Sequence, residues 1–396
     1  LRGSTFADFE WESAALYSRA WTRDEELNNI RHSRLQSALL RTDATAFNPF
    51  GYTFRNAGGV IQVDQPYTNP AAVVDPLTDV FIREGRTELG FEHIAIATGA
   101  RAIQLPLPGA DLEGVQVLRT AADAEKLKAA LGPGKHLAVV GGGYIGLEAA
   151  ASARALGAEA VVLEREPRIL ARVAVETLSS FFQAYHEARG VTFQCSVNVT
   201  GFEGKDGKVT GVTLSDGRVV PCDIALVGVG ARPNDALAKD AGLPCERGIV
   251  VDMEARTADP SIFAIGDVTY RPLPTYDRSF FLESVFNALD QAKQAACAIT
   301  GRAAPPVEAP WNWSDQYDLK LQIGGMPFDA DTTLVRGDIA AAKFAIFHLK
   351  GQQIQAVEAV NAPPEFMMGR QLIANRKPVD LAKLADPSIS MKEVAA

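Results

Sequence analysis

A glycine-rich turn between a short apolar strand and a small-residue helix constrains the fold of this chain more than any other feature. The apolar run 137–140 comes directly before three glycines in the arrangement G-x-G-x-x-G, namely Gly141, Gly143 and Gly146. The first glycine permits a tight turn, the second lets the backbone approach a pyrophosphate, and the third lets the following helix pack closely on the sheet. The sequence therefore predicts one strand–helix–strand unit of a parallel sheet.

The residues around this turn indicate which ligand it takes. A pyrophosphate is expected at the helix start, near Tyr144 and Ile145, because free amides and the helix dipole favour anions there. Glu164 ends the next strand, and a carboxylate there accepts hydrogen bonds from both ribose hydroxyls and repels a 2′-phosphate. We expect NADH rather than NADPH, although Arg165 and Arg168 are close enough to weaken that preference. The alternative is a glycine turn that only packs the strand–helix–strand unit.

Composition excludes several other classes of protein. A length of 396 residues implies two or three domains, and a net charge of −9 argues against a general nucleic-acid binder. The four cysteines and five histidines are scattered, so we expect no metal site. Neither a secretory signal nor a run long enough to span a bilayer is evident, so we expect a cytoplasmic protein that does not enter membranes.

Two further motifs resemble the flavoprotein reductases that have two dinucleotide-binding domains. The chain has I-A-I-A-T-G-A-R at 94–101 and I-F-A-I-G-D-V at 262–268. The resemblance implies an α/β fold with two Rossmann-like domains, the NAD domain being inserted into a discontinuous FAD domain. Prolines at 305, 306 and 310 mark a linker to a C-terminal α+β domain. The expected domains are 1–106 with 231–306 for FAD, 107–230 for NAD, and 307–396 as the C-terminal interface domain.

A more specific resemblance begins after the linker. The stretch 310–323 reads P-W-N-W-S-D-Q-Y-D-L-K-L-Q-I and is similar to the start of the C-terminal domain of NADH-dependent ferredoxin reductases. This family implies electron transfer from NADH through FAD to a small 2Fe–2S ferredoxin that serves a monooxygenase or dioxygenase. A monomer or weak dimer is expected. The hydride step needs no side-chain base, because the cofactors perform that chemistry.

The same resemblance assigns site residues. Glu148 is expected to approach the nicotinamide, Val285 to lie against the flavin ring, and Trp313 to lie near the flavin edge. The remaining expected FAD contacts and crossover positions are Thr98, Gly99, Ala100, Arg119, Gly230 and Asp267. We further expect an acidic ferredoxin to contact Arg370, Arg376 and Lys377, for which the alternative is a solvated helix end.

The first 89 residues do not fit the family pattern. Its members carry a second G-x-G-x-x-G there for the FAD pyrophosphate, and residues 1–89 contain none. Either this segment has diverged, or it is not the natural sequence of that region, or the chain does not hold FAD as its relatives do.

Three rival functions stay open from the sequence. A flavin disulfide reductase shares the domain plan but needs a cysteine pair beside the flavin, and no cysteine precedes Cys195. A peroxide-reducing flavoprotein needs one redox cysteine near the N-terminus. A regulatory protein that binds NAD and lacks flavin is the rival from a different class.

Overall fold

The computed structural model describes residues 93–395 in full and, before them, only the backbone of six short strands. These strands form three antiparallel pairs: β1 (Arg2–Ser4) with β2 (Glu10–Glu12), β3 (Tyr52–Ala57) with β4 (Val60–Pro66), and β5 (Val80–Arg83) with β6 (Arg86–Leu89). The first segment of the predicted FAD domain, 1–106, therefore lies largely outside the fully described residues.

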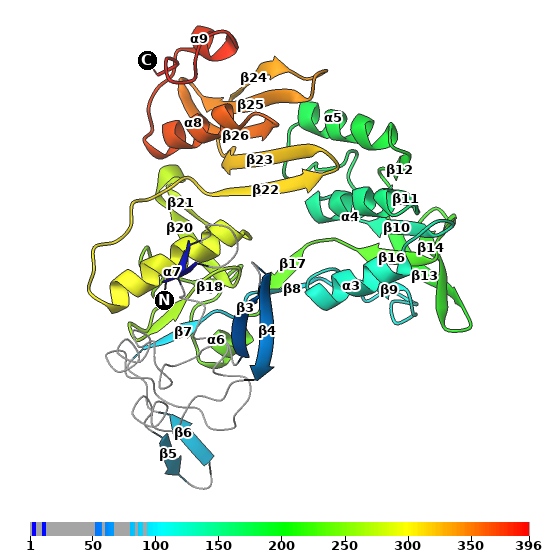
Figure 1. Cartoon of the computed structure of the whole chain (residues 1–396), viewed down its shortest axis with the longest axis horizontal. Helices are drawn as coiled ribbons and strands as arrows, with labels where there is room; N and C mark the ends of the chain where they lie inside the picture. Colours follow the sequence, from blue (N-terminus) through cyan, green and yellow to red (C-terminus); the bar gives the residue numbers. More distant parts are fainter. Residues whose placement is uncertain are drawn as a thin grey trace. The chain divides into compact units, whose positions relative to one another are not determined.

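The polypeptide forms two compact units (Figure 1). The first unit comprises residues 1–99, 233–273 and 278–306, and the second comprises 100–232, 274–277 and 307–396. The glycine turn and the C-terminal segment therefore belong to the same unit.

A five-stranded parallel sheet is the centre of the N-terminal half of the second unit. Its strand order is β12 (Val191–Gln194), β11 (Glu159–Leu163), β10 (His136–Val140), β16 (Ile224–Val227) and β9 (Val115–Gln116). The helices that accompany it are α3 (Ala121–Ala130), α4 (Tyr144–Ala155) and α5 (Glu176–Glu187). The strand–helix–strand unit predicted around the glycines is confirmed.

Both faces of this sheet are covered, which explains why its strands are almost wholly apolar. On β10, Leu137 and Val139 pack with α4 and α5, whereas Ala138 and Val140 point to the opposite face. That second face packs against an antiparallel sheet of three strands, β13 (Val199–Lys205), β14 (Lys208–Leu214) and β15 (Val219–Pro221). The turn from β14 to β15 has Gly217 at φ 85°, a conformation that favours glycine.

The C-terminal half of the second unit is an antiparallel sheet with two helices. The strand order is β22 (Trp311–Gln316), β23 (Leu319–Gly325), β26 (Gln353–Val360), β25 (Lys343–Lys350) and β24 (Thr332–Asp338). The helices are α8 (Pro363–Ala374) and α9 (Leu381–Ala385). The expected α+β character of this segment is confirmed.

One hydrophobic core joins the two halves of the second unit. Leu321 and Phe344 of the C-terminal sheet belong to the same buried cluster as Leu147 of α4 and Phe182 of α5. The ring of Phe181 meets that of Phe344 edge-on, with centroids 5.0 Å apart. The C-terminal sheet is therefore packed directly on the helices of the glycine-turn domain, as Figure 1 shows for β22 and α4.

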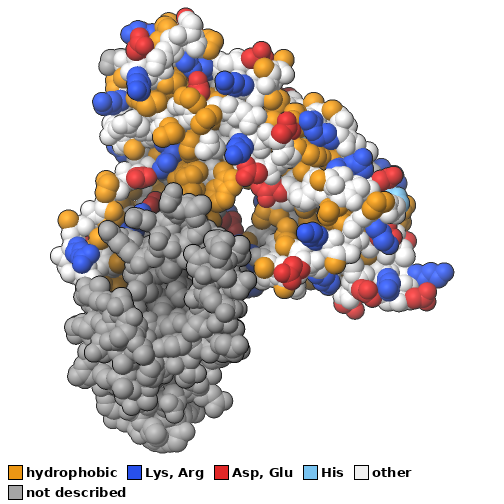
Figure 2. All heavy atoms as spheres, viewed as in Figure 1, with side chains coloured by type: hydrophobic (Ala, Val, Ile, Leu, Met, Phe, Trp, Pro, Cys, Tyr) orange, Lys and Arg blue, Asp and Glu red, His pale blue; other side chains and the backbone are white. Residues whose placement is uncertain are grey.

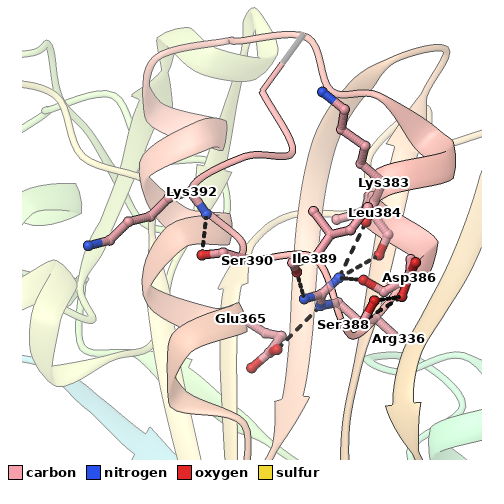
Figure 3. A network of polar contacts seen from close by, with 9 residues as sticks. All are labelled: Arg336, Glu365, Lys383, Leu384, Asp386, Ser388, Ile389, Ser390 and Lys392. Carbon is pink, nitrogen blue, oxygen red and sulfur yellow. Dashed lines mark hydrogen bonds and ion pairs between the residues drawn. The ribbon is translucent and has the colours of Figure 1, made fainter.

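Arg336 on β24 fastens the end of the chain to this sheet (Figure 3). Its guanidinium is 3% exposed and forms an ion pair with Glu365 of α8 at 3.3 Å. It donates further hydrogen bonds to the backbone carbonyl oxygens of Asp386 and Ile389, both at 2.6 Å, and more weakly to those of Lys383 and Leu384. One buried cation thus satisfies carbonyl groups along the segment that follows α9.

The described part of the first unit contains the other strands named by the motifs. β7 (Ile94–Ile96) pairs in parallel with β19 (Ile262–Ala264). A three-stranded sheet follows, with the order β18 (Ile249–Val250), β20 (Thr269–Leu273) and β21 (Arg278–Phe281). The helices are α6 (Ala236–Asp240) and α7 (Val285–Ile299), and a 3-10 turn, η3 (Pro274–Tyr276), belongs to the second unit. Where the chain passes between the units, β8 (Ala100–Ala102) pairs with β17 (Ala231–Pro233).

Candidate dinucleotide site

The glycine turn connects β10 to the first turn of α4. Gly141 has φ 109°, and a Cβ there would lie 2.5 Å from the carbonyl oxygen of Gly228. A Cβ on Gly146 would overlap the carbonyl oxygen of Gly141, so the helix packs against the turn itself. A Cβ on Gly143, in contrast, would meet no atom within 4 Å. An added Cβ would clash at Gly141 and at Gly146 but not at Gly143. The backbone at Gly143 therefore has the open space that the approach of a pyrophosphate needs.

The start of α4 offers backbone amides rather than a side-chain cap. Its N-cap is Gly143, and no side chain there accepts a hydrogen bond from the first turn. Ile145 is 49% exposed, whereas Tyr144 packs against the core and places its hydroxyl 3.4 Å from the carbonyl of Val173. Burial, with the nearby charge of Glu358, raises the pKa of Tyr144. The first amides of α4 have no side-chain cap and lie beside the exposed Ile145, so they can accept an anion as partner. Tyr144 packs against the hydrophobic core, a role that the sequence did not predict.

Glu164 is held in place by backbone donors. One carboxylate oxygen accepts the amide of Gly142 at 2.6 Å, and the other accepts the amide of Glu166 at 2.8 Å. The neighbouring Arg165 forms an ion pair with Glu166 at 2.9 Å. The carboxylate expected to bind the ribose is therefore fixed beside the glycine turn, and one of the two arginines that weaken the NADH preference has an acidic partner.

Glu148 lies one helical turn after the start of α4 and contacts the C-terminal sheet. Its carboxylate accepts a hydrogen bond from the hydroxyl of Ser314 at 2.5 Å. Burial raises the pKa of Glu148, the Ser314 hydrogen bond opposes that change, and the charge of Asp315 adds to it. Sequence reasoning missed Ser314. The only sequence pattern that could have indicated Ser314 is that it lies two positions before Gln316, so that two polar side chains share one strand face.

The two predicted crossover segments contact each other. The Thr98 hydroxyl donates to the carbonyl oxygen of Asn234 at 2.7 Å, and the Asn234 side chain donates back to the carbonyl of Thr98 at 2.9 Å. The Asn234 amide donates to the carbonyl of Gly99, which has φ 64°. Ala100 is buried, and Gly230 accepts the amide of Ile103 at 2.9 Å. These residues hold the crossover together, whatever else they bind.

The loop that carries Asp267 is tied to α7 through one buried amide. The side-chain oxygen of Gln291, which has no exposed surface, accepts the Gly266 amide and the Thr269 hydroxyl, each at 2.9 Å. Val285 begins α7 and is 55% exposed, although it is apolar. An exposed apolar side chain at a helix start, beside a fixed acidic loop, fits one face of a planar ring and its hydroxylated chain.

The remaining predicted residues lie in the second unit. Arg119 comes directly before the capping box of α3, and its backbone amide donates to Asp123. Trp313 on β22 is 44% exposed, and its ring lies 6.2 Å from that of Trp311. The structure thus brings the glycine turn, Glu148 and Glu164 together in one unit, and it places Thr98, Asp267 and Val285 in the other.

The cysteines carry no sign of redox chemistry. All four are free, and burial raises the pKa of Cys195, of Cys245 and, to about 12, of Cys222. A reactive thiol needs the opposite shift, because the thiolate is the nucleophile. Among residues 93–395 no three His, Cys, Asp or Glu side chains group as metal ligands, and no helix combines the length and apolarity needed to cross a membrane.

A parallel sheet, a glycine turn and a fixed carboxylate after the next strand are the arrangement of a dinucleotide-binding domain. Residues 15–296 match the family described as pyridine nucleotide-disulphide oxidoreductase, and residues 311–395 match the reductase C-terminal domain. A probable ferredoxin reductase of Castellaniella defragrans is 53% identical over 78% of this chain and 76% of its own. The rhodocoxin reductase of Rhodococcus erythropolis is 40% identical over 77% and 72%.

Solved structures agree with these relatives. The covalent complex of putidaredoxin reductase with putidaredoxin matches with a TM-score of 0.76 and 38% identity, over 78% of this chain and 76% of that one. The chain therefore belongs to the pyridine nucleotide-disulphide oxidoreductase family, among its ferredoxin reductases. The predicted family and fold class are confirmed, and FAD and NAD are its cofactors.

Proposed function

We propose that this chain is a flavoprotein reductase that transfers electrons from NADH through FAD to a small 2Fe–2S ferredoxin, which then serves a monooxygenase or dioxygenase. The observation that carries the proposal is the combination of the open glycine turn at Gly143 with the match of residues 311–395 to the reductase C-terminal domain. The relatives support the acceptor, since their names describe reductases of rhodocoxin and putidaredoxin.

The chain's own residues bind and orient NADH. Gly141, Gly143 and the first amides of α4 hold the pyrophosphate, and Glu164 accepts the ribose hydroxyls. Glu148 approaches the nicotinamide from the first turns of α4. The bound cofactors supply hydride transfer and then single-electron transfer, and the protein supplies orientation and exclusion of water.

We assign the flavin contacts to a second group of residues. Asp267 and Val285 are assigned to the hydroxylated chain and one ring face. The family resemblance assigns Thr98, Gly99, Ala100, Arg119 and Gly230 to the same cofactor. Trp313 supplies an exposed aromatic ring near the flavin edge. The fixed loop at Gly266 and the exposed Val285 support this assignment.

The three basic residues expected to contact the ferredoxin differ in their surroundings. Arg370 pairs with Glu308 at 2.8 Å and lies over the Trp311 ring, and Arg376 donates to the carbonyl of Pro274. Lys377 is exposed and stays a candidate. On the face drawn in Figure 2, acidic and basic side chains of the described residues are interspersed rather than gathered by sign. Docking through a few local charges fits this surface better than docking through a large basic patch.

The rival functions have less support. A disulfide or peroxide reductase needs an activated cysteine, and the raised pKa values of three of the four thiols oppose activation. A flavin-free NAD-binding protein is the other alternative, because residues 1–89 contain no second G-x-G-x-x-G, although the family match begins at residue 15.

The absorption spectrum of the purified protein, before and after incubation with FAD, tests the proposal. We expect a flavin spectrum that NADH bleaches under anaerobic conditions, and a bleached protein that reduces a 2Fe–2S ferredoxin. A colourless protein that cannot be reconstituted with FAD, yet binds NADH, would instead establish the regulatory alternative.

A further inference from the structure

Four polar side chains form a hydrogen-bonded row that begins on α5, passes through two residues of β22 and ends on α4. Nε2 of His186 on α5 lies 2.8 Å from Oε1 of Gln316, whose Nε2 lies 2.9 Å from the Ser314 hydroxyl oxygen. That hydroxyl lies 2.5 Å from Oε1 of Glu148 on α4. These four residues are called the polar row below. His186, Gln316 and Ser314 are at most 1% exposed.

Every hydrogen bond in the polar row points in one direction. An ionised carboxylate only accepts, so Ser314 donates to Glu148. The hydroxyl then accepts from the Gln316 amide nitrogen, and the amide oxygen accepts from Nε2–H of His186. This arrangement requires a proton on Nε2 of His186. The buried Nδ1 has no hydrogen-bond partner among the described residues, which favours the neutral imidazole.

The polar row lies at buried positions where apolar side chains are usual. Ser314 and Gln316 are two residues apart on β22 and so share one face of the strand, which is buried against α4 and α5. Buried polar groups at these positions lower stability relative to apolar ones unless they are fully hydrogen-bonded. Three buried polar side chains form a chain of hydrogen bonds that ends, through Ser314, on one carboxylate, and that carboxylate is the one predicted to face the nicotinamide.

We propose that Ser314, Gln316 and His186 are positioning residues that fix the Glu148 carboxylate for the nicotinamide end of the bound dinucleotide. This inference rests on the proposed function and deepens it. The C-terminal domain then contributes to recognition of NAD, through the contact of Ser314 with Glu148. A fixed anion stabilises the positively charged nicotinamide of NAD⁺ over the neutral ring of NADH.

Other charges near Glu148 determine how pH acts on it. Asp315 on β22 adds a negative charge, and its neighbour across the sheet is Lys320. The strands β10, β11 and β12 also pack against α4, and their titratable groups in the described structure are His136 and Glu159, at the far ends of the strands and 3.5 Å from each other. Glu148 is therefore the group expected to titrate beside the ring, at a pH above its ordinary 4.5 because burial raises its pKa.

The test compares two ligands of the oxidised holoenzyme, NAD⁺ and ADP-ribose, which lacks the nicotinamide. Titration calorimetry between about pH 5 and about pH 9 gives both affinities. In the wild-type protein we expect the ratio of NAD⁺ to ADP-ribose affinity to rise as Glu148 ionises. In Ser314→Ala the ratio should fall about tenfold at high pH and its midpoint should move to higher pH, because a charge-assisted hydrogen bond is lost. Glu148→Gln should abolish the pH dependence.

Matched variants keep the test specific. Ser314→Thr should restore the ratio, and Ser314→Cys, which keeps the shape with a weaker donor, serves if the alanine variant does not fold. Ser179→Ala is the control: that hydroxyl is equally buried at 1% exposure but donates to the carbonyl of Ile169, so its removal should leave the ratio unchanged.

Two outcomes would overturn the inference. One is a Ser314→Ala ratio and pH profile equal to wild type, and the other is an equal loss of affinity for both ligands, which indicates general structural damage. The proposed function is judged separately by reduction of the flavin with NADH. If the wild-type protein reduces its flavin but Ser314→Ala gives either outcome, only the positioning role is wrong.

Discussion

Gly143 and Gly146 differ in what an added methyl group would meet. At Gly146 it would overlap the carbonyl oxygen of Gly141, whereas at Gly143 it would project into open space. We expect Gly146→Ala to lower the free energy of unfolding by about 1–3 kcal/mol through overpacking. Gly143→Ala should keep stability within about 1 kcal/mol and weaken NADH binding about tenfold, by blocking the pyrophosphate. Circular dichroism melts and NADH titration separate the two effects, and identical behaviour of both variants would contradict them.

Glu164 is the residue expected to select NADH over NADPH. Its carboxylate is oriented by the amides of Gly142 and Glu166, so its charge is held beside the glycine turn. Glu164→Gln removes the charge and keeps the shape, and we expect the ratio of kcat/KM for NADH over NADPH to fall about tenfold. Glu159→Gln, at the exposed start of the same strand, is the control and should leave the ratio unchanged. If the ratio of kcat/KM for NADH over NADPH is unchanged in Glu164→Gln as well as in Glu159→Gln, a residue other than Glu164 sets the preference.

The sequence predicted the glycine turn and the position of Glu164 better than the side chains that contact Glu148. Gly141, Gly146 and Glu164 follow from local spacing, because a strand, a turn and a helix fix their relative positions within one unit of chain. The contact of Ser314 with Glu148 joins residues 166 positions apart. Nothing in local spacing specifies it, because it depends on how the C-terminal sheet packs on α4.

At the scale of elements, strongly patterned segments were predicted and weakly patterned ones were missed. The apolar run 191–194 predicts a strand, and the runs 208–214 and 218–221 on either side of a Ser-Asp-Gly turn predict a hairpin; the structure has β12, β14 and β15 there. The strand β13 was missed, since its glycines at 201 and 204 and its exposed end weaken the pattern. Pairing with β14 forms this strand, and pairing is a tertiary property that propensity does not specify.

The C-terminal helix α9 and the segment after it receive hydrogen bonds from a single side chain on β24. Arg336 donates to the carbonyls of Asp386 and Ile389, and it pairs with Glu365 (Figure 3). Arg336→Met should leave these carbonyls without their donor, so we expect faster amide hydrogen exchange in residues 380–395 and a loss of about 3 kcal/mol of stability.

Glu365→Gln is the matched control for this prediction. It keeps the arginine and its carbonyl hydrogen bonds while removing one charge, and it should give a smaller loss. Protection of residues 380–395 that is the same in Arg336→Met as in wild type would show that packing alone holds α9.

At the scale of the whole molecule, the C-terminal segment shares a core with the glycine-turn domain. Local sequence does not specify that Phe182 on α5 and Phe344 on β25 contact one core, because the two residues are far apart in the chain. The structure supplies that information by placing both residues in one cluster. The polar row crosses the same junction, so its titration reports on the contact between the two halves.

Stability of this junction should depend on pH through His186. Burial is the largest influence on His186 and lowers its pKa below the ordinary 6.5, although Gln316 opposes the shift. The unfolded chain therefore binds a proton that the folded chain rejects, and stability is lost as pH falls below about 6.5, at up to about 1.4 kcal/mol per pH unit. Thermal unfolding midpoints should fall through this window in the wild type and fall less in His186→Asn. Equal slopes in the two proteins would mean that His186 is not kept neutral by the fold.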